Sequence, residues 1–221
     1  MLKYYFRQCT LTKLDKEFGL RQTFSNATLE QWLQTPTPLS DYERMVLEHL
    51  RHLLSINVPG WNEQELALHF IGPLLSLISF TEPYRFNLFA ERRISAIVPG
   101  LQDDIELLGD PDGMVATGYR EPEIPLFAFT EYKRQLDPEG DPAGQTLAAM
   151  LTGQTLNAKQ QPIYGAYVVG SDWRFMVLEG IHYSISRDYS ALSDEIFVIL
   201  SALKTLKSII LDLTANDSEK H

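Results

Sequence analysis

Residues 110–133 read DPDGMVATGYREPEIPLFAFTEYK and contain two β-rich runs. The first run, Met114–Thr117, follows the turn-forming sequence Asp110-Pro111-Asp112-Gly113. The second run, Ile124–Thr130, is apolar with little alternation, which is typical of a strand that is buried on both faces of a sheet. The stretch therefore predicts two strands of an antiparallel meander, with acidic residues where the first strand begins and where the second one ends.

Two helices are predicted before this meander. The first begins at the capping box Ser40-Asp41-Tyr42-Glu43 and ends before Pro59-Gly60. The second covers residues 62–78, and Pro73 is expected to kink or divide it because proline cannot donate a backbone hydrogen bond.

The other elements follow from the same kinds of signal. Apolar runs bounded by Gly, Pro and Asp predict strands, and amphipathic or small-residue runs predict helices. The expected strands are Phe86–Val98, Ile105–Leu108, Ile163–Val169 and Trp173–Leu178, and the expected helices are Asp141–Asn157 and Ala191–Leu213. Because a helix between the meander and the later strands allows a crossover, the predicted fold class is α/β, with a mixed sheet flanked by helices.

The chain length of 221 residues fits one domain with a small addition. We expect residues 1–38 to form an N-terminal appendage, with a short strand near Tyr4–Cys9 and a short helix near Leu29–Leu33. Residues 39–213 are expected to form the α/β domain, and residues 214–221 a flexible tail.

The composition, with 44% hydrophobic and 22% charged residues, is that of a globular protein and excludes collagen-like, coiled-coil and wholly disordered chains. The longest apolar stretch, Phe70–Phe80, is far shorter than the roughly 20 residues that span a bilayer. The first residues lack the apolar centre of a secretory signal. We therefore expect no membrane partner. Because the lone Cys9 has no partner for an internal disulfide, we expect a cytoplasmic protein.

The formal net charge of −10 argues against a protein that coats nucleic acid with a broad basic surface. The negative charge is concentrated between Leu101 and Asp141, where eleven acidic residues accompany three basic ones. Such a cluster is usual in solvated loops, and the alternative is a site that binds a cation.

Three residues in this region suggest a catalytic site. Glu131 and Lys133 are two apart at the end of a predicted strand, so they point to the same face, and Asp112 comes alongside Glu131 if the two strands pair. Carboxylates of this kind hold Mg²⁺ or Mn²⁺, which polarises a phosphodiester, and the lysine orients or deprotonates the attacking water. The structural alternatives are a strong turn for Asp112 and an exposed strand end for Glu131.

The motif resembles that of the PD-(D/E)xK nuclease superfamily, here as Pro111-Asp112 and Glu131-Tyr132-Lys133. The sequence Asn62-Glu63-Gln64-Glu65 and the apolar residues after it are similar to the first core helix of the nuclease domains at the N-terminus of type I restriction R subunits and their stand-alone relatives. The resemblance implies a restriction-endonuclease-like fold over residues 62–178. It also implies that a glutamate of the first helix completes the metal site and that Gln145 lies near the motif.

Geometry selects one of the two glutamates. On a helical wheel Glu63 shares a face with the apolar residues of its helix, whereas Glu65 points away. We therefore expect Glu63 to be an accessory metal ligand and Glu65 to cap the helix in solvent. The alternative is that both are ordinary first-turn glutamates, which the helix dipole favours. Gln145 shares its face with Ala149 and Thr152, so a packing role is equally compatible with its position.

The leading hypothesis is thus a Mg²⁺- or Mn²⁺-dependent endonuclease-like hydrolase, with Asp112 and Glu131 as metal ligands and Lys133 beside the attacking water. The alternative is a nuclease-fold interaction or binding module without catalysis that acts within a larger complex. Because the chain is acidic, we expect it to bind DNA weakly by itself. A homodimer or a partner protein would then supply DNA binding.

Overall fold

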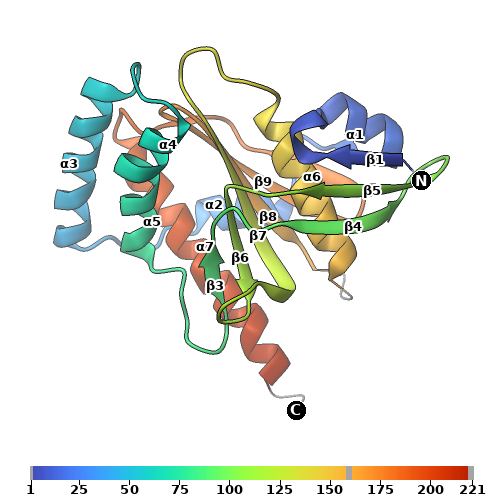
Figure 1. The fold of residues 1–221 in the computed structure, drawn as a ribbon. Helices are drawn as coiled ribbons and strands as arrows, with labels where there is room; N and C mark the ends of the chain where they lie inside the picture. The colour runs from blue at the N-terminus through green and yellow to red at the C-terminus, as the bar shows by residue number, and fades with distance from the viewer. Residues whose placement is uncertain (1, 158–160, 219–221) are drawn as a thin grey trace.

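The computed structural model describes residues 2–157 and 161–218 and contains two sheets (Figure 1). In the larger sheet the strands follow the order β2-β10-β9-β8-β7-β6-β3, with β11 beside β9. These strands are β2 (Arg21–Gln22), β3 (Asn87–Phe89), β6 (Gly113–Thr117), β7 (Glu123–Lys133), β8 (Ile163–Val169), β9 (Asp172–Glu179), β10 (His182–Ile185) and β11 (Tyr189–Ser190). The smaller sheet has the order β1-β5-β4, formed by β1 (Leu2–Tyr5), β4 (Ile94–Pro99) and β5 (Asp104–Gly109).

The larger sheet is mixed. Strands β7 and β8 are parallel and are connected by the helix α6 (Pro142–Leu156), whereas β6 and β7 are antiparallel, as are β8 and β9. A parallel pair needs a crossover connection, and α6 supplies it. The expected α/β class with a mixed sheet flanked by helices is therefore confirmed.

Helices cover both faces of the larger sheet, which accounts for the apolar strands. The side chains of Val115 and Val177 belong to one core, and those of their sequence neighbours Met114 and Met176 belong to the other. The first core is closed by α2 (Ala27–Gln34), α3 (Asp41–Asn57), α4 (Glu63–Leu66), α5 (Gly72–Ile78) and α7 (Glu195–Ser218). The second is closed by α6, by α1 (Leu11–Phe18) and by the smaller sheet.

The helical segment from Glu63 to Ile78 is continuous, so Pro73 neither divides it nor ends it. A π-helical turn, Ala67–Ile71, lies between α4 and α5, and the Gly72 N–H donates to the Ala67 carbonyl five residues earlier. Pro73 occupies the first turn of α5, where a missing N–H is tolerated. The expected division of the helix therefore does not occur, and the distortion beside the proline is the π-helical turn.

The expected strand Phe86–Val98 is wrong in its extent, because the chain leaves the larger sheet after β3. Glu91 has φ = 50°, a left-handed conformation that no strand residue adopts. Strands β4 and β5 then form a hairpin in the smaller sheet. The chain returns at Pro111, whose carbonyl accepts a hydrogen bond from the Glu91 N–H at 3.2 Å. The antiparallel meander of the larger sheet is therefore β3-β6-β7, with the β4–β5 hairpin inserted in it.

The segment that we expected to be an appendage is part of both cores. Strand β1 pairs with β5, β2 pairs with β10, and the Trp32 ring in α2 is buried with its Nε1–H donating to the Ala202 carbonyl. A Cβ at Gly144 of α6 would lie 2.5 Å from the Thr10 Cα, so the N-terminal segment packs directly on the crossover helix. These contacts join positions more than 100 residues apart, which local sequence patterns do not report.

At the other end of the chain, α7 continues to Ser218, so residues 214–218 of the expected flexible tail are helical. Residues 219–221 of that tail lie outside the described residues. Within the described part of the chain, none of the helices combines the length and the apolar character that crossing a membrane requires.

Candidate functional site

The candidate site forms where β6 begins and β7 ends. The pairing of Gly113 with Thr130 places Asp112 beside the end of β7, and the Asp112 Oδ2 accepts a hydrogen bond of 2.6 Å from the Tyr132 N–H. A Cβ at Gly113 would lie 2.4 Å from the Thr130 Oγ1, so only glycine allows this close approach of the two strands. The turn sequence and the strand pairing together fix the Asp112 carboxylate.

Glu131 and Lys133 emerge together from β7. The Lys133 Nζ donates to the Glu131 Oε1 at 2.9 Å, and both side chains are about nine-tenths buried. From the helix α4, the Glu63 Oε1 approaches the same Lys133 Nζ to 3.7 Å. One ammonium group is thus shared by a carboxylate from the sheet and a carboxylate from the helix.

The two glutamates of the first helical turn have different partners. The Glu65 Oε2 accepts a hydrogen bond from the Asn62 N–H at 2.8 Å, and the Asn62 Oδ1 accepts one from the Glu65 N–H at 2.9 Å, which completes a capping box. Glu63 is turned toward Lys133 instead. The orientations agree with those that the helical spacing predicts, whereas the metal-binding role of Glu63 stays a prediction.

The negative charge of the cluster exceeds what Lys133 neutralises. Burial, and then the neighbouring charge of Asp112, raises the pKa of Glu131 to about 7, although Lys133 acts in the opposite direction. Burial also raises the pKa of Asp112, with further contributions from the charges of Glu63 and Glu91, while the hydrogen bond from the Tyr132 N–H opposes the shift. Carboxylates that repel one another in a partly buried site are stabilised by an additional cation.

The pKa of Lys133 is also shifted. Burial lowers it, but the charges of Glu131, Glu63 and Asp112 together outweigh burial, so the net shift is upward. The amine is therefore protonated at neutral pH.

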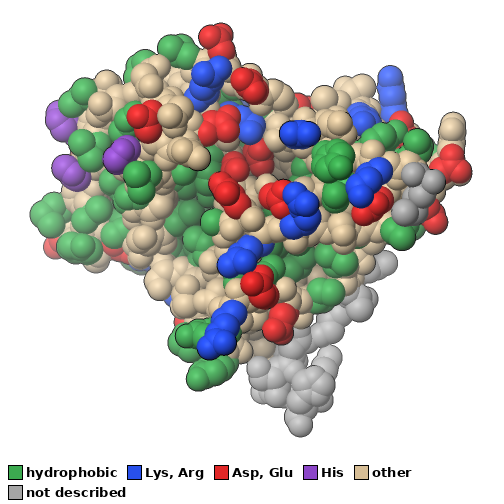
Figure 2. Space-filling model, viewed as in Figure 1, with side chains coloured by type: hydrophobic (Ala, Val, Ile, Leu, Met, Phe, Trp, Pro, Cys, Tyr) green, Lys and Arg blue, Asp and Glu red, His purple; other side chains and the backbone are tan. Residues whose placement is uncertain are grey.

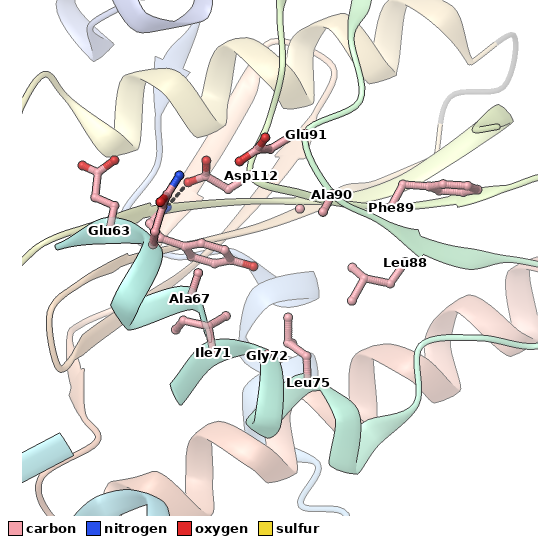
Figure 3. A pocket seen from close by; sticks show the side chains of 13 residues that line it. Glu63, Ala67, Ile71, Gly72, Leu75, Leu88, Phe89, Ala90, Glu91 and Asp112 are labelled. Atoms are coloured by element: carbon pink, nitrogen blue, oxygen red, sulfur yellow. Dashed lines mark hydrogen bonds between the residues drawn. The ribbon is translucent and has the colours of Figure 1, made fainter. Parts of the chain in front are cut away.

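Glu91 is a member of the cluster that the sequence analysis missed. It follows β3, whose antiparallel pairing with β6 brings it next to the turn that carries Asp112. Figure 3 shows the carboxylates of Glu91 and Asp112 side by side at one end of a cavity. Glu63 lies at the same end, on the side of the helix. Glu91 lies two residues after the end of β3 and has a positive φ. The predicted strand Phe86–Val98 runs through this position, so it gives no reason to single out Glu91.

A cavity of about 380 Å³ adjoins the carboxylates. It lies between the helical segment α4–α5 and the strands β3 and β6 (Figure 3). Its lining combines the acidic residues with mostly apolar ones: Glu63, Gln64, Ala67, Ile71, Gly72, Leu75, Leu88, Phe89, Ala90, Glu91, Asp112, Gly113 and Tyr132.

Gln145 is buried near the beginning of α6. A Cβ at Gly140 would lie 2.6 Å from the Gln145 Nε2, so the amide packs against the loop between β7 and α6. Among the described residues, no hydrogen bond or ion pair joins Gln145 to Asp112, Glu131 or Lys133. The structure therefore brings together four of the five expected site residues and gives Gln145 a packing contact.

The donor set fits a hard divalent cation by its chemistry, because Asp112, Glu131 and Glu63 all offer carboxylate oxygens. Within residues 2–157 and 161–218, however, no three His, Cys, Asp or Glu side chains stand in an arrangement that could hold a metal ion. The Lys133 ammonium holds Glu131 and Glu63 in the present arrangement. The carboxylates would have to move toward an ion to bind it together.

No family model matches the chain, and the curated proteins contain no match to it. The functional interpretation therefore depends on the arrangement of the residues in the site.

Proposed function

We propose that the chain is a metal-dependent nuclease of the PD-(D/E)xK type that hydrolyses phosphodiester bonds in DNA with Mg²⁺ or Mn²⁺. The observation that carries the proposal is the cluster formed by Asp112 before β6, Glu131 and Lys133 on β7, and Glu63 on α4. A motif that arose by chance in the sequence would have no reason to converge with a glutamate from a separate helix.

The order of the elements supports a restriction-endonuclease-like core. The helical segment Glu63–Ile78 comes first, followed by the antiparallel strands β3, β6 and β7, the crossover helix α6 and the parallel strand β8. Residues of the motif lie at the start of the second strand of this meander and at the end of the third. The inserted β4–β5 hairpin and its pairing with β1 are additions to the expected core.

In this mechanism Asp112 and Glu131 would hold the ion, with Glu63 as an accessory ligand. The bound ion would polarise the phosphodiester and promote formation of hydroxide. Lys133 is protonated at neutral pH, so its ammonium acts as a hydrogen-bond donor that orients the attacking water and offsets negative charge at the phosphate. Of the two roles expected for the lysine, orientation of the water therefore fits the structure better than deprotonation.

The surface around the site favours weak binding of DNA by the chain alone. Figure 2 shows Lys and Arg side chains interspersed with Asp and Glu over the central part of the face in view. Arg93 pairs with Asp110 at 2.8 Å, and Arg92 pairs with Glu121 at 3.2 Å. Paired arginines attract phosphates less than free ones, so we propose that a homodimer or a partner protein supplies the remaining affinity.

A second candidate function is a nuclease-fold interaction module without catalysis. The observation that favours it is the closed set of ion pairs between Lys133, Glu131 and Glu63, which partly neutralises the cluster without a metal ion. The acidity of the whole chain, with a net charge of −10, points in the same direction.

A cleavage assay separates the two candidates. The Lys133→Met variant should lose cleavage by at least about 100-fold while it retains Mn²⁺ binding, because the substitution removes the donor but none of the carboxylate ligands. Lys204→Met, which removes another ion-paired lysine far along the chain, is the matched control and should cleave like the wild type. The assay uses single- and double-stranded DNA and RNA at low salt with Mg²⁺ and with Mn²⁺. Absence of cleavage by the wild type on every substrate would favour the binding module.

A further inference from the structure

The cavity beside the carboxylates has two chemically different ends. Glu63, Glu91 and Asp112 lie at one end, and the side chains of Ile71, Leu75 and Leu88 lie at the other (Figure 3). Among the described lining residues, the charged side chains are all at the first end. A ligand that fills this cavity therefore has an apolar part joined to a part that is suited to the carboxylates or to a cation held by them.

Small residues create the space at the apolar end. The π-helical turn Ala67–Ile71 is followed directly by Gly72, and Ala67 and Gly72 both line the cavity. Ala90 lines it from the opposite side, after β3. π-Helical turns inside α-helices are frequent at functional sites, because they displace the helix surface locally. The shape of the helix here thus provides an open space where larger side chains would form a closed core.

The size and the chemistry of the cavity fit a nucleobase. A volume of about 380 Å³ is within the range of sites for small organic molecules. In a nucleic acid, the apolar group nearest to a phosphodiester is the base of the adjoining nucleotide. A base in a duplex is stacked and paired, and it reaches a side cavity only when it is unpaired or flipped out of the helix.

We propose that the cavity binds an unpaired nucleobase next to the phosphodiester at the carboxylates, and that the substrate class is nucleic acid with a single-stranded segment at the scissile position. The inference rests on the proposed function, since it takes the carboxylate end as the place of the phosphate. Apolar contacts do not distinguish between the four bases, so the cavity selects for an unpaired strand and not for a sequence.

Three ligands test the two ends of the cavity separately, each in the presence of Mn²⁺. Thymidine probes the apolar end, deoxyribose 5-phosphate probes the carboxylate end, and thymidine 5′-monophosphate probes both. Calorimetric titration of the wild type should show that the nucleotide binds at least about tenfold more tightly than the sugar phosphate, because burial of the base against apolar side chains adds affinity.

Ala67→Phe fills the apolar end and should remove the difference between the nucleotide and the sugar phosphate while it leaves the affinity for the sugar phosphate unchanged. Leu68→Phe is the matched control, because it places the same ring on the next residue, which is exposed, and it should bind all three ligands like the wild type. Circular dichroism establishes that each variant is folded. If Ala67→Phe is unfolded, Leu88→Phe fills the same space from the opposite strand.

The outcomes distinguish this inference from the proposed function. Equal affinities of the wild type for nucleotide and sugar phosphate would overturn the base site and leave the nuclease proposal standing. Binding of thymidine, with no added affinity from the phosphate, would support the cavity and contradict the proposed phosphodiester site. Failure of all three ligands to bind up to millimolar concentration would overturn both. A nucleotide preference that persists in Ala67→Phe would show that the base is bound elsewhere.

Discussion

Two lysine–glutamate pairs in this protein have similar distances, but the pKa values of their glutamates are shifted in opposite directions. The Lys204 Nζ lies 2.7 Å from the Glu43 Oε1, and the Lys133 Nζ lies 2.9 Å from the Glu131 Oε1. Burial tends to raise the pKa of Glu43, but hydrogen bonds from Lys204 and Ser40 outweigh it, and the pKa is lowered. Burial and Asp112 raise that of Glu131 to about 7.

Burial and the number of carboxylates for each cation together explain the difference. Glu43 has its own lysine and accepts two hydrogen bonds from Ser40 in the capping box of α3. Glu131 shares Lys133 with Glu63, and Asp112 and Glu91 add further negative charge. A balanced pair joins two helices, whereas a surplus of buried carboxylates costs stability and is typical of a functional site.

The largest expected effect is the difference between removing the two lysines in the absence of divalent cations. Lys133→Met should destabilise the protein by about 3 kcal/mol at neutral pH, because it leaves a buried carboxylate without its partner. Lys204→Met should cost only about 1 kcal/mol, because the Lys204 side chain is more exposed than that of Lys133 and Glu43 keeps two hydrogen bonds from Ser40. Urea unfolding of both variants checks the prediction. Equal losses would mean that the two pairs are equivalent and that the surplus of charge at Glu131 has no energetic consequence.

The pH dependence of stability should have opposite signs at the two glutamates. The folded-state pKa of Glu131 is above the ordinary value of 4.5, so its contribution to stability is complete below about pH 4.5 and is lost as the pH rises to about 7. The lowered pKa of Glu43 gives a contribution that is present above about pH 4.5 and is lost as the pH falls further. Both windows apply to metal-free protein.

Unfolding free energies from pH 3 to 8 for the wild type, Glu131→Gln and Glu43→Gln measure these two windows. Glu131→Gln should flatten the decline between about pH 4.5 and 7, and Glu43→Gln should reduce the acid sensitivity below about pH 4.5. A decline near neutral pH that is the same in Glu131→Gln and in the wild type would assign the titration to another group.

The smallest effect concerns the two glutamates of α4. Glu65→Gln retains an acceptor for the Asn62 N–H, so it should change stability by less than about 0.5 kcal/mol and leave Mn²⁺ affinity unaltered. Glu63→Gln should change stability as little, because its side chain is partly exposed, but it should weaken Mn²⁺ binding severalfold. Equal Mn²⁺ affinities for the two variants would show that Glu63 is not a metal ligand.

Much of the cluster was predictable because its geometry is local. The spacing of Glu131 and Lys133 in a strand, the turn before Asp112 and the helical wheel of Glu63 depend on residues close in sequence. Glu91 was not predictable in this way, because it joins the cluster only through the pairing of β3 with β6 and the positive φ that it adopts after β3. Gln145 was placed by analogy alone, and its packing against Gly140 depends on the loop after β7.

The same division holds for the fold. Helix α3 and the strands β6 to β9 follow from capping and apolar patterns in the chain itself. The role of the N-terminal segment was missed because its partners are distant: β1 pairs with β5, and Trp32 donates to Ala202. Neither contact produces a hydrophobic pattern among residues that are close in sequence. Each segment by itself is short and mixed in composition, so its partner cannot be inferred from it.

Calorimetric titration of Mn²⁺ into the wild type, Asp112→Asn and Glu43→Gln tests the central claim, which is that the surplus carboxylates around Lys133 form a metal site. The account predicts one ion for each wild-type chain and a higher melting temperature with Mn²⁺, because a ligand that binds the folded state stabilises it. Binding and stabilisation should be lost in Asp112→Asn and retained in Glu43→Gln. Absence of Mn²⁺ binding to the wild type at millimolar concentration, or unchanged binding in Asp112→Asn, would contradict the account.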